Sequence, residues 1–197
     1  MNANFALKIK HLTVNIMGLS SLGIFHTVIG VLAIIAAVIG FIKHGKIALP
    51  SVTGKIYFYG TLITSLTALG LSSVSGFNPG HGLALLIVLL IAGSHYLHTK
   101  KQGYNHYRLF ENFFLSFSFF LSLIPTVNET LTRVPVGHPV AKGPTDPLIA
   151  QTLGIVLLLF LLGSIYQFIK QRKLNAAAKQ HALSATLRIH GVISSID

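Results

Sequence analysis

The stretch "SSLGIFHTVIGVLAIIAAVIGFI", residues 20–42, decides the class of fold. It contains no Lys, Arg, Asp or Glu, and its length falls within the roughly 17–25 residues of helix that cross a bilayer. Further apolar stretches of similar length follow at 56–76, 82–99, 109–127 and 148–169. The sequence therefore predicts an all-α polytopic membrane protein, a bundle of five transmembrane helices.

Composition supports lipid as the solvent for most of the chain. Of the 197 residues, 52% are hydrophobic and only 10% are charged, whereas a soluble domain has about 25% charged residues. The net charge of +11 suits basic loops facing an anionic lipid surface, so we expect the bilayer and no nucleic acid as partner. The absence of cysteine excludes disulfides and thiolate chemistry.

The basic residues predict how the helices are oriented. Eleven of the 15 Lys and Arg residues fall on one side: three within 43–55, three within 100–108 and five in the tail beyond 169. Loops rich in Lys and Arg stay in the cytoplasm. We therefore expect a multi-pass protein of the inner (plasma) membrane, with its N-terminus outside and its C-terminus cytoplasmic.

Three segments flank or interrupt the transmembrane domain at 20–169. Residues 1–19 are expected outside, and an alternative is that residues 5–18 form an amphipathic helix on the outer surface. Residues 128–147 contain four prolines and predict an irregular outer loop. Residues 170–197 are expected to form a basic cytoplasmic tail, which continues the fifth helix.

Histidines are the best candidates for chemistry. His26 lies 16 residues before Ile42 and His81 lies 18 residues before Thr99, which are about 24 and 27 Å along a helix. Both are therefore expected near one level below the outer surface. His44, His95 and His98 close the first and third helices at the inner surface.

Two helices with a histidine at each level can hold haem b by bis-imidazole ligation. The expected ligands are His26 and His81 outside, and His44 with His95 or His98 inside, with no metal other than haem iron. The alternative interpretation is that these histidines only anchor helix ends. A second alternative places His26, His81, His138 and Glu129 in an outer zinc or copper site.

The stretch "GSHYLHTKKQGYNHYRLFENFF", residues 93–114, adds a polar cluster at the inner surface. The third helix ends here and the fourth begins. An acidic side chain within a membrane segment is costly, so Glu111 is expected to have a function. The cluster can relay protons, hold haem propionates or bind a quinone head. Its alternative interpretation is a local pair between Arg108 and Glu111, three residues apart. The candidate residues are Tyr96, His106, Arg108 and Glu111, together with His95 and His98.

Three motifs resemble a family of bacterial membrane proteins. "FHTVIGVLAIIAAVIGFI", "TGKIYFYGTLITSLTALG" and "NHYRLFENF" are similar to the family catalogued as domain of unknown function 2306, over most of residues 20–127. The matching positions are His26, Gly54, Lys55, Tyr57 and His106, whereas Pro50 stands where that family usually has a histidine. The resemblance implies a polytopic inner-membrane protein and no particular activity. The placement of histidines also resembles that of small di-haem membrane cytochromes.

Three functions follow as hypotheses. The first is a membrane electron carrier that binds haem b or interacts with a quinone, and that exchanges electrons with a redox partner protein. The second is a small-solute or proton-coupled transporter, which with five helices would need to form a homodimer. The third is a non-catalytic assembly or scaffold protein of the membrane.

Overall fold

The computed structural model describes residues 21–71, 79–100 and 105–193. Those residues form helices joined by short loops, and no strand occurs among them. The predicted all-α class is therefore confirmed for the described chain. The expectations for residues 1–19 fall outside the described residues. The helices are α2 (Ser21–His44), α3 (Val52–Leu71), α4 (Pro79–Lys100), α5 (Asn105–Arg133) and α6 (Pro147–Ile193).

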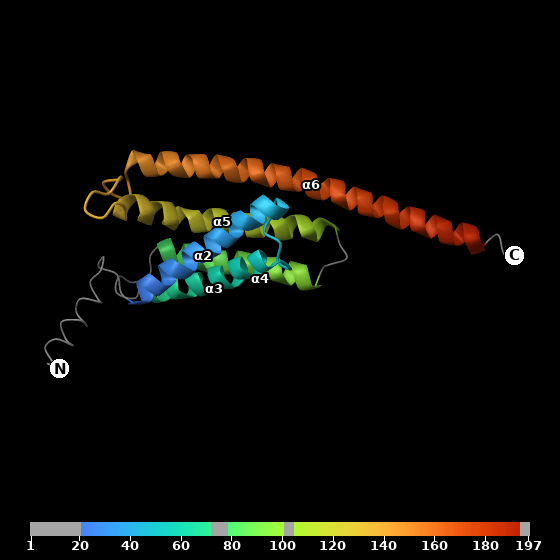
Figure 1. Cartoon of the computed structure of the whole chain (residues 1–197), viewed down its shortest axis with the longest axis horizontal. Helices are drawn as coiled ribbons and strands as arrows, with labels where there is room; N and C mark the ends of the chain where they lie inside the picture. The colour runs from blue at the N-terminus through green and yellow to red at the C-terminus, as the bar shows by residue number, and fades with distance from the viewer. Residues whose placement is uncertain (1–20, 72–78, 101–104, 194–197) are drawn as a thin grey trace, which may run out of the picture.

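Successive helices run in alternating directions (Figure 1). Helices α2 to α5 form a bundle, with buried residues from all four meeting in one core, and α6 packs along α5. We call the end where α2 and α4 finish and α3 and α5 begin the basic end. Beyond this end α6 continues alone toward the C-terminus (Figure 1).

Four helices are long and apolar enough to cross a membrane: α2, α4, α5 and α6. The shorter α3, which carries many Gly, Ser and Thr residues, does not belong to this set. The outward faces of the four are rich in Leu, Ile, Val and Phe, and only 6% of the α6 span is buried. Apolar surface of this extent indicates contact with lipid.

Helix ends differ from the predicted ones mainly at the end opposite the basic end. The fourth helix was predicted to stop at Val127, but α5 runs on to Arg133. Glu129 and Arg133 form an ion pair one turn apart, a spacing that supports polar helix, so residues 128–133 are not loop. Asp146 then caps α6, because its Oδ1 accepts a hydrogen bond of 3.0 Å from the Leu148 backbone N–H.

The last helix continues past residue 169, the predicted end of its membrane-spanning part, as expected for the tail. It extends without a break over 47 residues, a length of about 70 Å. The part from residue 170 to Ile193 contains basic residues and no acid. A basic helix therefore projects from the basic end.

Close contact between α2 and α3 depends on small residues, as expected for membrane helices. A Cβ added to Gly60 would lie 2.9 Å from the Ala33 Cβ. In the first turn of α3, a Cβ on Gly54 would clash with the carbonyl oxygen of Ala48 in the preceding loop. Only glycine fits there, and Ser51 Oγ accepts the Gly54 N–H at 3.0 Å, which starts the helix.

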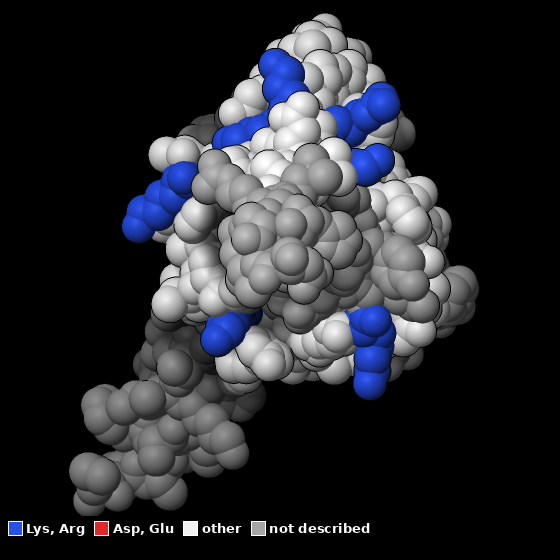
Figure 2. All heavy atoms as spheres, turned by 90° about the vertical axis from the view of Figure 1, so that its right-hand side faces the viewer, with Lys and Arg blue, Asp and Glu red and all other residues white. Residues whose placement is uncertain are grey.

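Charge is distributed very unevenly between the two ends. Figure 2 shows basic side chains around the basic end and no acidic side chain in view. Among the residues whose side chains the structure describes, nine Lys and Arg lie at this end or on the projecting part of α6, against one acid, Glu111. The opposite end carries two described bases and two acids. The nine are Lys43, Lys46, Lys55, Lys100, Arg108, Lys170, Arg172, Lys173 and Lys179.

Candidate functional site

A partly buried pair between α4 and α5, His98 with Glu111, lies at the basic end. His98 Nδ1 is 2.9 Å from Glu111 Oε1, and Glu111 is only 7% exposed. The two helices are antiparallel neighbours, so the last turn of α4 meets the first turns of α5. This partner differs from Arg108, which is exposed and makes no ion pair with Glu111. Glu111 thus joins two helices instead of pairing along its own.

A small pocket lies beside this pair. It has a volume of about 170 Å³. Phe58 provides an aromatic wall, since its ring centroid is 5.2 Å from those of His95 and Tyr59. The pocket therefore combines aromatic surface with hydrogen-bond donors. The lining residues are Leu49, Pro50, Lys55, Phe58, Tyr59, His95 and His98.

A second polar network joins α5 to α6. Asn112 Nδ2 donates to Gln171 Oε1 at 3.1 Å, and Ser116 Oγ donates to Gln167 Oε1 at 2.8 Å. Lys46, from the loop between α2 and α3, donates to the same Gln171 oxygen at 3.5 Å. Burial lowers the pKa of the Lys46 ammonium below its usual 10.5, although Glu111 acts in the opposite direction. This network ties three parts of the chain together.

This second network was not predicted from the sequence. Its signal is a spacing of four residues, Asn112 with Ser116 on one helix and Gln167 with Gln171 on the other. Such spacing places polar groups on one helix face. The sequence candidates are all ionisable or aromatic residues, whereas this network consists mainly of neutral amides.

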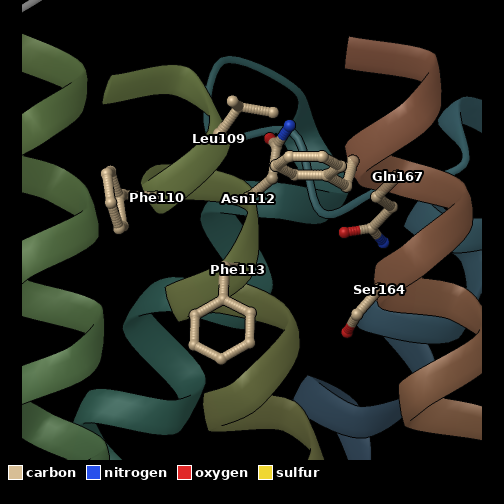
Figure 3. A pocket seen from close by; sticks show the side chains of 7 residues that line it. Leu109, Phe110, Asn112, Phe113, Ser164 and Gln167 are labelled. Atoms are coloured by element: carbon tan, nitrogen blue, oxygen red, sulfur yellow. The ribbon is translucent and has the colours of Figure 1, made fainter. Parts of the chain in front are cut away.

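A groove of about 340 Å³ runs between α5 and α6 next to this network. Figure 3 shows Gln167 and Ser164 on α6, and Asn112, Leu109 and Phe113 on α5. Four of the seven lining side chains are apolar, including three phenylalanines. The lining residues are Leu109, Phe110, Asn112, Phe113, Ser164, Gln167 and Phe168.

His26 and His81, the two histidines predicted near the outer surface, both contact α3. His26 Nδ1 is 3.0 Å from Thr67 Oγ1, and His81 Nε2 is 3.3 Å from the Leu69 carbonyl oxygen. They come from α2 and α4, which both pack on α3. Each ring thus has a hydrogen bond of the kind that orients a metal ligand, and equally of the kind that holds a structural histidine. Haem ligation by these rings stays a prediction.

The remaining sequence candidates are spread over the basic end. His44 is exposed at the end of α2, and Tyr96 is 56% exposed. His95 is exposed against Phe58, and His106 is exposed with its ring 4.3 Å from that of Tyr107. Of the predicted inner cluster, the structure joins His98 directly to Glu111, with His95 beside them in the pocket.

No three His, Asp or Glu side chains of the described chain are grouped as a metal ion would require. The alternative outer metal site is therefore not assembled. Glu129 pairs with Arg133, and His138 is exposed in the loop after α5.

No family model matches the chain, and no curated protein or solved structure shows significant similarity to it. The resemblance to the family of unknown function stays a prediction.

Proposed function

We propose that this protein is a quinone-interacting membrane electron carrier, which binds a quinone ring in the pocket between Phe58 and His98. The proposal depends on one observation: the partly buried hydrogen bond between His98 and Glu111 lies at the wall of a pocket that also contains Lys55 and an aromatic face. We place the basic end in the cytoplasm, and the protein in the inner membrane.

The residues of the pocket match both redox forms of a quinone. Nδ1 of His98 is bonded to Glu111, so Nε2 is the nitrogen that can meet a ligand. When His98 is neutral, with its proton on Nδ1, Nε2 accepts a hydrogen bond from a quinol hydroxyl. When His98 is protonated, Nε2–H donates to a quinone carbonyl, and the Lys55 ammonium is a second donor.

Size favours a single ring over a haem at this position. The pocket volume of about 170 Å³ lies below the roughly 300–1,000 Å³ of sites that enclose a whole drug-sized ligand. A quinone needs to insert only its head, because its isoprenoid tail can remain in lipid. Haem b would have to bind elsewhere.

One observation favours a second function, a proton-coupled transporter. A carboxyl group buried inside a membrane bundle is expensive and commonly marks a proton path. Glu111 fits this description. The transporter hypothesis predicts that Glu111→Gln abolishes solute uptake in vesicles while quinone has no effect on the protein.

The experiment is a calorimetric titration of the full chain in lipid nanodiscs with a short-chain ubiquinone and a short-chain menaquinone. We expect saturable binding that His98→Ala weakens about tenfold, the loss of one charge-assisted hydrogen bond. His106→Ala is the matched control, because His106 lies outside the pocket. Equal binding by both variants, or none by the wild type, would refute the proposal. An absorption spectrum of the same sample tests haem separately through the Soret band.

A further inference from the structure

The groove between α5 and α6 contains a buried hydroxyl that the protein does not use. Ser164 Oγ is buried and has no hydrogen-bond partner. The neighbouring amides are already engaged, Asn112 with Gln171 and Gln167 with Ser116. Unpaired buried donors are rare because they are costly. An acceptor supplied by a ligand in the groove would satisfy this one.

Cations flank the groove on the side of the basic end. The Arg172 guanidinium lies 5.5 Å from the centroid of the Phe168 ring, which lines the groove. Ser164 is one helical turn, about 6 Å, deeper in the bundle than Phe168. On α5, Arg108 is exposed one turn before Asn112, which lines the groove. Positive charge, buried hydroxyl and apolar surface thus follow one another from the basic end inward.

We propose that this groove binds a phospholipid with an anionic head group. The phosphate lies against Arg172 and Arg108, an ester carbonyl accepts the Ser164 hydroxyl hydrogen, and an acyl chain lies on Phe110 and Phe113. Basic pockets between transmembrane helices on the cytoplasmic side are suited to acidic head groups. This site is separate from the proposed quinone pocket, since the two share no lining residue.

The test measures lipid binding to the full chain in detergent by native mass spectrometry, with thermal unfolding as a second readout. The probes are dioctanoyl phosphatidylglycerol, dioctanoyl phosphatidylcholine and inorganic phosphate. Two guanidinium contacts predict that the glycerol lipid binds about 30-fold more tightly than the choline lipid. Arg172→Gln should reduce the ratio of the two affinities about fivefold. Lys179→Gln, the same loss of charge on the projecting part of α6, should leave the ratio unchanged.

Ser164→Ala distinguishes the groove from a purely electrostatic surface. Both lipids carry ester carbonyls, so this variant should weaken both by about fivefold and leave their ratio unchanged. Equal binding of the two lipids by the wild type would overturn the proposal, as would identical effects of Arg172→Gln and Lys179→Gln. Displacement of the glycerol lipid by millimolar phosphate would show a site for free anions and overturn it too.

Discussion

The coupling between His98 and Glu111 gives the sharpest test of the candidate site. The perturbation is a double-mutant cycle with His98→Ala, Glu111→Ala and the double variant. The pair is mostly shielded, with side chains 24% and 10% exposed at 2.9 Å. Hydrogen bonds to charged groups contribute about 1.5–3 kcal/mol in water-soluble proteins. Interhelical bonds in membranes average about 0.6 and reach about 1.7 kcal/mol. We therefore expect a coupling of about 1.5 kcal/mol.

The chain provides its own control pair. Glu129 and Arg133 also form an ion pair, but their side chains are 54% and 52% exposed. Exposed pairs one turn apart on a helix contribute about 0.3–0.5 kcal/mol. The same cycle on these two residues should therefore give about a quarter of the coupling between His98 and Glu111.

The assay is reversible unfolding in mixed micelles by a denaturing detergent, followed by far-ultraviolet circular dichroism. All variants are compared in one micelle composition, so changes in the unfolded reference state largely cancel in the cycle. A coupling for His98 and Glu111 no larger than that of the control pair would refute the reasoning. The hydrogen bond between His98 and Glu111 would then contribute nothing specific to the fold.

Three further predictions concern the loops and glycines. Gly54→Ala should lower the free energy of unfolding by at least about 3 kcal/mol in the same assay, because the added Cβ would clash with the Ala48 carbonyl oxygen. Gly163→Ala is the control: nothing lies within 4 Å of its Cβ, so this change should be neutral or stabilising by up to about 1 kcal/mol. Burial lowers the pKa of Lys46 from 10.5, so the unfolding free energy should rise with pH up to 10.5 and then level off. Lys46→Met should lose this rise, and a rise of equal size in the variant would assign it to another group. Two backbone N–H groups lower the pKa of Asp146 below 3.8, so its stabilisation is present above pH 3.8 and lost as the pH falls through the lowered value. Asp146→Asn should reduce this loss of unfolding free energy at acid pH. An unchanged loss in the variant would contradict the role of this cap.

The sequence located most helices because length and polarity are local properties. A charge-free stretch such as residues 20–42 has no stable alternative to a helix in lipid, and α2 occupies Ser21–His44. The prediction was wrong where polar residues continue a helix. Residues 128–133 contain Glu129 and Arg133, and their pairing one turn apart forms helix where composition alone indicates loop.

The candidate site was predicted in part. His98 and Glu111 were both expected at the inner surface, because depth follows from counting residues along each helix. Their direct contact depends on how each helix is rotated about its axis. The same rotation turns Arg108 and His106 outward and brings Gln167 and Gln171 of α6 against α5.

The sequence by itself thus determined an all-helical chain with apolar lengths that suit a membrane, and a basic end. The tertiary structure alone decided which polar groups become partners: His98 with Glu111, Lys46 and Asn112 with Gln171, and Ser164 with none. The physical reason is that residue number sets height along a helix, whereas contact across helices depends on their rotation and packing order.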